Sequence, residues 1–323
     1  MTNEPGGVKV RVATKRDEAV DICSFELVRA DGEPLPAFSA GSHIDVAVPG
    51  GLTRQYSLCN APDERHRYLI AVLRDPNSRG GSAALHDRVQ VGDELSISVP
   101  KNHFPLEGDA AHSLLLAGGI GVTPILSMAE RLAATGASFE MHYCARSRTR
   151  AAFLARLAGA SYAPHVRFHF DDEAEGHKFD IAAWLAQAAR DTHLYVCGPT
   201  GFIDAGLRTA RDAGWPDAQL HAESFGANSR DTVTNERFEV QIASSGRVVV
   251  VEQNESVVQA LARAGILIDT SCEQGVCGTC ITRVLAGEPD HADICLTPDE
   301  RAANDQFVPC CSRSKSPRLV LDL

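Results

Sequence analysis

The stretch TSCEQGVCGTC, residues 270–280, contains three cysteines within eleven positions. Cys272, Cys277 and Cys280 have the spacing C-x4-C-x2-C, and PCC, residues 309–311, offers a fourth cysteine about thirty residues later. This is the ligand spacing of plant-type 2Fe–2S proteins. The spacing therefore predicts a one-electron carrier, with the β-grasp fold of a plant-type ferredoxin domain, at the C-terminal end of the chain.

The glycines inside this stretch suit a loop that surrounds a cluster. Gly275 and Gly278 can adopt left-handed backbone angles, which bring backbone N–H groups close to the sulfur ligands. For the fourth ligand the sequence favours Cys310, because it falls where ferredoxins of this type carry the closing cysteine, with Cys311 in the small apolar position after it. Cys295 and Cys311 remain alternatives.

Other uses of cysteine fit the pattern less well. A structural zinc site usually shows two separated cysteine pairs, whereas this chain has one triplet and a distant single cysteine. The start, MTNEPGGVKVRV, has no charged-then-apolar leader, and no apolar run reaches membrane-spanning length. We therefore predict a cytoplasmic protein, in which ten cysteines do not form a disulfide framework. Zinc and buried, unliganded cysteines stay open as alternatives.

The bulk composition is that of an ordinary globular protein. A chain of 323 residues can hold two or three domains, and its contents of 44% apolar and 23% charged residues are typical. The formal net charge is −11, with acidic and basic residues mixed along the chain. This argues against nucleic acid as a partner, which would require a basic patch.

The first hundred residues predict an antiparallel β-barrel or sandwich, of which we favour the barrel. In GSHIDVAVPGG, Ile44, Val46 and Val48 alternate with more polar neighbours, which is the period of a half-buried strand. Three further strand-like runs are bounded by Gly, Pro, Asp or Asn: TRQYSLCN (53–60), RYLIAVLRD (67–75) and DELSISVP (93–100).

From residue 112 onward the pattern changes to alternating strands and helices. HSLLLAGG, FEMHYC, VRFHF, HLYVC and QLHAESF read as strands, and amphipathic stretches lie between them. Such alternation predicts a parallel sheet with crossover helices. We therefore expect a β-barrel domain at 1–108, an α/β domain at 109–226, a linker at 227–237 and the ferredoxin domain at 238–323.

Two glycine turns in the α/β region are candidates for nucleotide binding. In LLLAGGIGVTPILSM, Gly118, Gly119 and Gly121 lie between a strand and a helix, for which Thr123 is the predicted N-cap and Pro124 the first residue. YVCGPTGF (195–202) places Cys197, Gly198 and Pro199 at the carboxyl end of another strand, where ligands of open α/β sheets bind. Two alternatives involve no nucleotide: the first glycine stretch can be simply a tight turn between strand and helix, and Cys197 can be a buried structural cysteine.

The barrel region contains two motifs that suit a flavin. In RQYSL (54–58), Arg54 and Ser57 can hydrogen-bond phosphate or ring edges, and Tyr56 can lie on a flat ring. In GGSAALHD (80–87), the N–H groups of Gly80, Gly81 and Ser82 open a short helix and can hold a phosphate. Alone, RQYSL reads as a strand with a core tyrosine. A flavin is favoured because it can pass two electrons from a nucleotide singly to a cluster.

Taken together, these motifs resemble the phthalate dioxygenase reductase family, which includes the reductase components of vanillate O-demethylase and related Rieske oxygenases. RQYSL, GGSAALHD, GGIGVTPILSM, YCARS, YVCGP, HAESF and the cysteine loop stand in the family's order and span essentially the whole chain. Each motif alone is shared with the wider ferredoxin–NADP reductase superfamily.

The resemblance implies FMN rather than FAD, because the chain continues into a ferredoxin instead of ending on an aromatic residue. It implies NADH bound at the two glycine turns, and it places Glu223 and Phe225 near the flavin or nicotinamide. Arg146, Arg148 and Arg150 in YCARSRTR are the alternative, since they can meet the 2′-phosphate of NADPH. The implied cofactor-binding residues are Arg54, Tyr56, Ser57, Gly80, Gly81, Ser82, Gly118, Gly119, Gly121, Thr123, Cys197, Gly198, Pro199 and Phe225.

The expected activity is a relay from NADH to FMN, from FMN to the 2Fe–2S cluster, and from the cluster to a partner oxygenase. The implied catalytic residues are Ser57, Thr123, Cys197 and Glu223, with Ser57 at the N5/O4 edge of the flavin and Thr123 and Cys197 beside the nicotinamide. The family also implies a monomer. Two alternatives remain: the same relay serving a different monooxygenase or demethylase, and a redox-sensing module.

Overall fold

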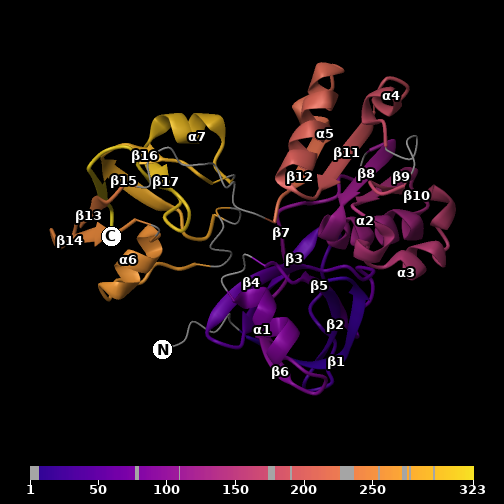
Figure 1. The fold of residues 1–323 in the computed structure, drawn as a ribbon, viewed down its shortest axis with the longest axis horizontal. Helices are drawn as coiled ribbons and strands as arrows, with labels where there is room; N and C mark the ends of the chain where they lie inside the picture. Colours follow the sequence, from indigo (N-terminus) through magenta and orange to yellow (C-terminus); the bar gives the residue numbers. More distant parts are fainter. Residues whose placement is uncertain are drawn as a thin grey trace. The chain divides into compact units, whose positions relative to one another are not determined.

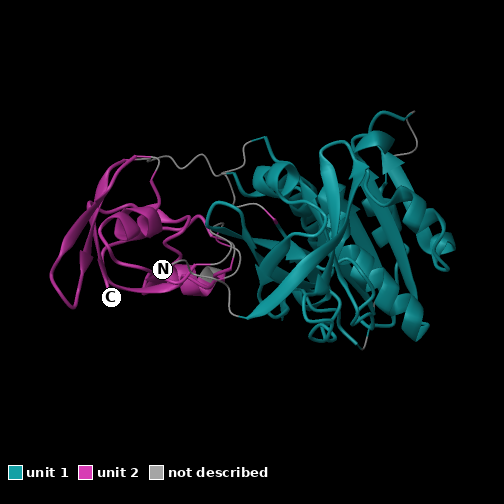
Figure 2. Cartoon of the chain, turned by 90° about the horizontal axis from the view of Figure 1, so that it is seen from below, with its two compact units in different colours: residues 1–224 teal, residues 225–323 magenta. Residues whose placement is uncertain are grey.

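The computed structural model describes residues 7–76, 80–108, 110–173, 179–189, 191–225, 236–253, 255–270, 275, 278–293 and 295–323. The chain divides into two compact units, residues 1–224 and residues 225–323, coloured separately in Figure 2. Of the predicted linker, 227–237, only Glu236 and Arg237 belong to the described residues. In the described parts of the chain, every helix is too short or too polar to cross a membrane.

The N-terminal part of the first unit is an antiparallel barrel, as predicted. Its strand order is β4-β3-β6-β1-β2-β5, with β7 paired to β3 and with β4 in contact with β5 across the closure. Val8, Val10 and Val12 alternate with exposed residues along β1 and point into the core. The strands are Val8–Ala19, Ile22–Arg29, Ser42–Val48, Leu52–Ser57, Tyr68–Leu73, Glu94–Ile97 and Lys101–Asn102 (β1–β7), and the helix α1 is Gly81–Arg88 (Figure 1).

Strand β3 differs from its prediction as a half-buried strand. Ile44, Val46 and Val48 face the core, but His43 and Asp45 on the other face are also buried. They are covered because β3 pairs with β4, β6 and β7. The buried polar groups are paired: Lys101 Nζ lies 2.8 Å from an Asp45 carboxylate oxygen, and the His43 ring stacks on His103.

The second part of the first unit contains a five-stranded parallel sheet, which confirms the predicted α/β fold. Its order is β10-β9-β8-β11-β12, and every neighbouring pair is parallel. Helices α4 and α5 cover one face and pack on Leu114, Leu116 and Val196. The strands β8–β12 are His112–Gly118, Phe139–Ala145, Val166–Phe170, Thr192–Cys197 and Leu220–Glu223. The helices α2–α5 are Val122–Thr135, Leu154–Ala158, Ile181–Leu185 and Thr200–Asp212.

The helix after the first glycine turn begins earlier than its sequence predicted. A 3₁₀ turn over Gly119–Gly121 runs directly into α2, so Gly121 is the N-cap, and the prediction of Thr123 as N-cap was wrong. The Thr123 hydroxyl instead donates to the carbonyl of Ile120 at 3.1 Å and closes this turn. Pro124 still lies in the first helical turn, where its missing N–H leaves no hydrogen bond unmade.

The second unit has the β-grasp arrangement that the cysteine spacing predicted. Its sheet order is β14-β13-β19-β15-β17, with β13 and β19 parallel and helix α6 in contact with β14. Ser256 caps α6 through a reciprocal capping box with Gln259. The strands β13–β19 are Phe238–Ile242, Val248–Val251, Thr282–Ala286, Pro289–Asp290, Gln306–Phe307, Arg313–Ser314 and Arg318–Leu321, and the helices α6 and α7 are Val257–Arg263 and Pro298–Ala303.

Candidate functional site

Two glycine turns lie against each other at the carboxyl ends of β8 and β11. A methyl group on Gly121 would overlap the backbone carbonyl of Cys197, and one on Gly198 would lie 3.0 Å from Gly118 Cα. Side chains are therefore excluded where the turns meet. The structure thus brings together the two turns that the sequence selected separately.

Cys197 and Glu223 occupy neighbouring positions at the same edge of the sheet. They are register partners on the parallel strands β11 and β12, so their side chains leave the same face. Cys197 is fully buried, and its burial together with the nearby Glu223 raises the pKa of its thiol well above the usual value. Cys197 is therefore a neutral thiol at physiological pH rather than a reactive thiolate.

Ser57, at the end of β4 in the barrel, reaches this edge. Its hydroxyl donates to Oε2 of Glu223 at 3.3 Å, and Ser57 itself is buried. Because side chains alternate along a strand, Ser57 leaves the face of β4 opposite to Arg54 and Tyr56. Ser57 thus contacts the edge of the parallel sheet where the glycine turns lie, while Tyr56 on the opposite face of β4 packs against the barrel core.

Burial makes the Glu223 carboxyl an unusually weak acid. It raises the pKa to about 8, and the hydrogen bond from Ser57 offsets only part of this rise. Glu223 is therefore mostly protonated at neutral pH. A carboxylic acid next to a serine hydroxyl is an arrangement that can hold a proton and pass it on.

Arg54 packs against the start of helix α1. A methyl group on Gly81 would lie 2.7 Å from both Cγ and Nε of Arg54, so only glycine leaves room for this side chain. Arg54 is buried, and its Nη1 also donates to the Thr53 carbonyl at 2.7 Å. A buried guanidinium and the first N–H groups of a helix together form a donor set that fits a phosphate.

Tyr56 and Ser82 belong to the same two motifs as Arg54 and Gly81. Tyr56 is partly buried against the barrel core, and burial raises the pKa of its phenol, so the ring stays neutral. The Ser82 hydroxyl accepts a hydrogen bond from the Asp75 backbone N–H at 3.2 Å, which ties α1 to the segment after β5. As predicted, a helix opens at these residues, and Gly80 precedes it with a left-handed backbone.

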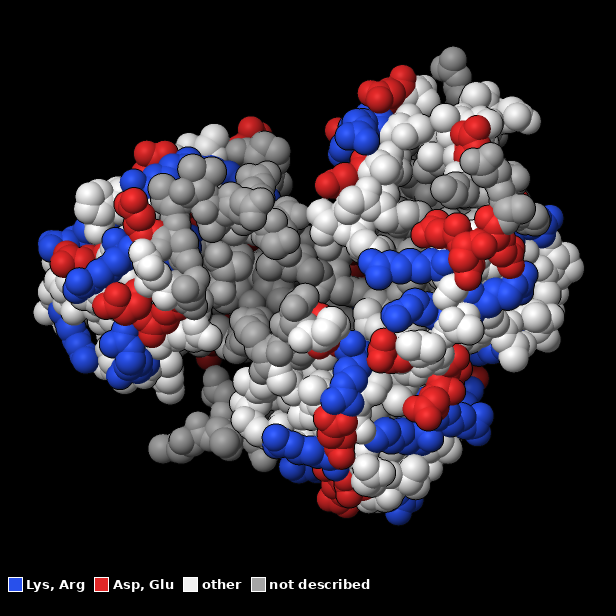
Figure 3. Space-filling view, in the orientation of Figure 1, with Lys and Arg blue, Asp and Glu red and all other residues white. Residues whose placement is uncertain are grey.

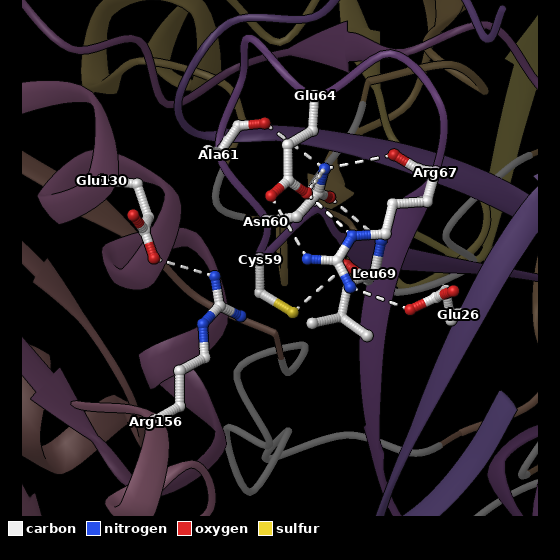
Figure 4. Close-up of polar contacts among 9 residues, drawn as sticks. All are labelled: Glu26, Cys59, Asn60, Ala61, Glu64, Arg67, Leu69, Glu130 and Arg156. Atoms are coloured by element: carbon white, nitrogen blue, oxygen red, sulfur yellow. Dashed lines mark hydrogen bonds and ion pairs between the residues drawn. The ribbon is translucent and has the colours of Figure 1, made fainter. Parts of the chain in front are cut away.

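A buried asparagine, which the sequence analysis did not select, holds the loop that follows Ser57 (Figure 4). Asn60 Oδ1 accepts from the Leu69 backbone N–H at 2.9 Å, and Nδ2 donates to the Arg67 carbonyl at 3.2 Å and to a Glu64 carboxylate oxygen at 3.3 Å. Arg67 in turn pairs with Glu64 and Glu26. The end of β4 is thereby fixed to the start of β5.

Figure 4 also shows an ion pair of the α/β part, between Arg156 and Glu130, whose nearest nitrogen and oxygen are 3.0 Å apart.

Cys59 lies next to Asn60, and its thiol donates to the Leu69 carbonyl at 3.1 Å. Burial raises the pKa of Cys59 to about 12, and the charge of Arg156 opposes this rise. Cys59 is therefore an inert part of the loop's packing.

The arginines considered for a 2′-phosphate are largely engaged by carboxylates. Arg148 pairs with Glu173 at 2.7 Å and also lies over the Phe170 ring, and Arg150 pairs with Asp21 at 3.5 Å. Arg146 is exposed. Figure 3 shows the same mixture of both charges over the visible face of the first unit, without a basic patch.

The second unit places two of the four predicted cluster ligands together. Cys280 and Cys310 are buried in one apolar cluster with Leu296 and Val308. Cys272 and Cys277 lie outside the described residues. The eight cysteines that the structure describes form no disulfide.

The glycines of the cysteine loop have the predicted conformation. The φ angles of Gly275 and Gly278 are +75° and +70°, values that L side chains rarely adopt. A methyl group on Gly275 would also overlap the sulfur of Cys311. Cys311 therefore packs against the loop, while the more deeply buried Cys310 shares its surroundings with Cys280. This arrangement fits a cluster held by Cys310.

Thr123 and Phe225 are two further residues of the predicted site. Thr123 is buried, and its hydroxyl is used within its own turn. Phe225 is partly buried and is the first residue of the second unit. Their roles at the cofactor remain predictions.

Comparison with known proteins agrees with both units. Residues 240–315 match the 2Fe-2S iron-sulfur cluster binding domain, and residues 100–220 match the N-terminal domain of dimethylamine monooxygenase subunit DmmA-like proteins. A vanillate O-demethylase oxidoreductase from a Pseudomonas strain is 54% identical over 98% of this chain and 100% of its own length.

Two solved structures resemble the whole chain. Phthalate dioxygenase reductase, described as a modular structure for electron transfer from pyridine nucleotides to 2Fe–2S, has a TM-score of 0.83 with 40% identity over 98% of both chains. An intact type IV self-sufficient cytochrome P450 monooxygenase has a TM-score of 0.77 with 40% identity, over 98% of this chain and 41% of its own. The chain belongs to the phthalate dioxygenase reductase family.

Proposed function

We propose that this chain is an NADH:acceptor oxidoreductase that passes electrons from NADH through FMN to a 2Fe–2S cluster, and then to a Rieske-type aromatic-ring oxygenase or O-demethylase. The observation that carries the proposal is the contact of Ser57 with Glu223, because it joins the flavin motif to the edge where both glycine turns lie. The similarity to a vanillate O-demethylase oxidoreductase and to phthalate dioxygenase reductase supports this assignment.

The residues around α1 suit FMN. When bound, a flavin accepts two electrons from a nucleotide and releases them singly. Arg54 and the N–H groups of Gly81 and Ser82 hold the phosphate, and Tyr56 packs beside the ring. The close packing of Arg54 on Gly81 supports this assignment, since it keeps the guanidinium at the helix start.

The nucleotide lies at the turns Gly118–Gly121 and Cys197–Pro199, where a methyl group on Gly119 would meet no atom within 4 Å, so a ligand has room to approach the backbone. Catalysis by the protein combines positioning with a proton held at Glu223. Ser57 orients the edge of the flavin, and Glu223 holds a proton that the Ser57 hydroxyl can relay. Because carboxylates engage Arg148 and Arg150, a 2′-phosphate has fewer free cations to meet, which favours NADH over NADPH.

The remaining assignments follow the family. We assign the flavin to residues 1–108, the nucleotide to residues 109–226 and the cluster to residues 238–323, with a linker at 227–237. Cys272, Cys277, Cys280 and Cys310 are the cluster ligands. A monomeric state and a cytoplasmic location stay predictions.

A haem monooxygenase is the second candidate acceptor. The specific observation is that a self-sufficient cytochrome P450 contains a reductase portion similar to this whole chain. The cluster would then reduce a haem protein instead of a Rieske centre. Reduction of each acceptor class by the purified chain, measured side by side with NADH as donor, separates the two.

Removal of the cluster tests the order of the relay. Cys280→Ser and Cys272→Ser should abolish NADH-dependent reduction of the partner and of cytochrome c, while reduction of ferricyanide, which the flavin can perform directly, is retained. Equal loss of both activities would argue against a flavin upstream of the cluster. A wild-type protein that reduces cytochrome c only negligibly would instead favour the redox-sensing alternative.

A further inference from the structure

The second unit buries a carboxylate beside the cysteine loop. The Asp293 side chain is 0% exposed. Its Oδ2 accepts the backbone N–H of Leu296 at 3.0 Å, and its Oδ1 accepts the hydroxyl of Ser312 at 3.3 Å. Buried charges persist only where such donors and counter-charges replace water.

Arg301 on helix α7 supplies the counter-charge. Its Nη2 donates to the backbone carbonyl of Asp293 at 2.7 Å, and its Nε lies 3.6 Å from the Asp293 carboxylate. The His291 ring approaches the same carboxylate at 3.5 Å. The buried Asp293 and the partly buried Arg301 therefore form a pair of opposite charges that joins the segment before α7 to the helix.

Asp293 contacts both segments that carry predicted cluster ligands, the cysteine loop and the segment after Cys310. A methyl group on Gly275, in the cysteine loop, would lie 2.9 Å from Asp293 Cα and 3.2 Å from its Cβ. On the other side, the Ser312 hydroxyl that donates to Asp293 also accepts the Ala292 N–H at 3.2 Å, and Ser312 follows Cys310 by two residues. Asp293 thus lies between the loop and the segment that carries the closing ligand.

A charge in this position acts on the cluster's potential as well as on its loop. Reduction adds one electron to a cluster, so a nearby carboxylate disfavours the reduced form and a nearby guanidinium favours it. Cluster potentials respond to net charge and to hydrogen bonding in their surroundings. In a buried environment water screens these charges only weakly.

We propose that Asp293 and Arg301 are positioning residues of the 2Fe–2S centre, which hold its two cysteine segments together and set its midpoint potential through their opposite charges. The inference rests on the proposed function only in requiring that the chain carries the cluster. It differs from a purely structural role because it predicts shifts of opposite sign for the two partners.

The test is a redox titration of the full-length holoprotein, in which the reduced cluster is followed by electron paramagnetic resonance. Asp293→Asn should raise the midpoint potential and Arg301→Gln should lower it. We expect each shift to correspond to about a tenfold change in the ratio of reduced to oxidised cluster, which is about 59 mV for one electron. The midpoint potential of the double variant should be close to that of the wild type. The potential of Arg301→Lys, which keeps the positive charge, should also be close to that of the wild type.

Glu239→Gln is the matched control, because it removes one charge from an exposed ion pair with Arg318 in the same unit and should leave the potential unchanged. Shifts of the same sign, absent shifts, or an equal shift in Glu239→Gln would overturn the proposal. If Asp293→Asn loses its iron, the Arg301→Gln and Arg301→Lys pair decides alone. A wild-type protein without iron would refute the proposed function itself, whereas a wild-type cluster with unshifted variants would refute only this inference.

Discussion

Ser57 Oγ lies 3.3 Å from Glu223 Oε2 and so connects two residues that are 166 positions apart in the sequence. The contact joins the last residue of β4 in the barrel to the last residue of β12 in the parallel sheet. It brings a hydroxyl from the flavin motif onto a carboxyl group that is protonated at neutral pH. The two parts of the first unit thereby share one polar site.

Replacement of Glu223 by Gln should slow the reductive half-reaction. Gln can keep the hydrogen bond from Ser57 but carries no acidic proton, so we expect the rate of flavin reduction by NADH to fall roughly 100-fold, the lower end of general acid–base effects. Stopped-flow absorbance of the flavin measures this rate. Glu94→Gln, at an exposed position of β6, is the control and should have no effect.

The same carboxyl predicts the pH dependence of that step. The folded pKa of Glu223 is about 8, so the proton is present below pH 8 and is lost above it. The wild-type rate should decline as the pH rises through 8, and the rate of Glu223→Gln should be flat there. An identical decline in both proteins would show that another group controls the step.

Glu223 also affects stability with a defined sign. The pKa of this carboxyl is about 8 in the folded protein, against an ordinary value of 4.5 in the unfolded chain, so the unfolded chain releases its proton first as the pH rises. The free energy of unfolding of the first unit should therefore fall between pH 4.5 and pH 8. Urea unfolding of Glu223→Gln at several pH values should show a weaker decline, and an unchanged decline would contradict the assigned pKa.

His142 should make the free energy of unfolding decrease as the pH is lowered, whereas Glu223 makes it decrease as the pH is raised. It is buried against Phe179 and lies 2.9 Å from His169, and burial lowers its pKa from 6.5 to about 4, although Glu140 opposes this shift. As the pH falls below 6.5, the unfolded chain binds a proton at this site before the folded chain does, so the free energy of unfolding falls. The difference in pH slope between wild type and His142→Phe isolates this effect, and equal slopes would exclude it.

Asn60 is predicted to stabilise the loop after Ser57. Asn60→Ala leaves the Leu69 N–H and the Arg67 carbonyl without their partner, so the free energy of unfolding should drop by about 1–3 kcal/mol. Because the loop positions the end of β4, flavin should also dissociate more readily. Denaturation and flavin fluorescence measure the two effects. Gln90→Ala, at an exposed site, should change neither.

The sequence predicted most of the architecture because strand and helix periods and the order of the motifs are local properties. The β-barrel and the parallel sheet were recognised in this way. The N-cap of α2 was missed because a 3₁₀ turn, which leaves no distinct pattern, precedes the helix. The burial of His43 and Asp45 was missed because it depends on how many neighbours β3 acquires.

The candidate site was predictable to a similar extent. Motifs located Arg54, Ser57 and the glycine turns, because these residues carry recognisable local chemistry. Asn60 and Asp293 lack such a pattern, since their importance comes from partners that fold against them from other segments. The raised pKa of Glu223 likewise arises from burial, which cannot be read from the linear sequence.

Anaerobic titration of the purified full-length chain with NADH tests the central claim most directly. We predict that the protein contains flavin, iron and acid-labile sulfide, that NADH bleaches the flavin absorbance, and that a reduced 2Fe–2S resonance appears in the same titration. A colourless protein without iron or sulfide would contradict the proposal, as would a bound cluster that NADH leaves oxidised while the flavin is fully reduced.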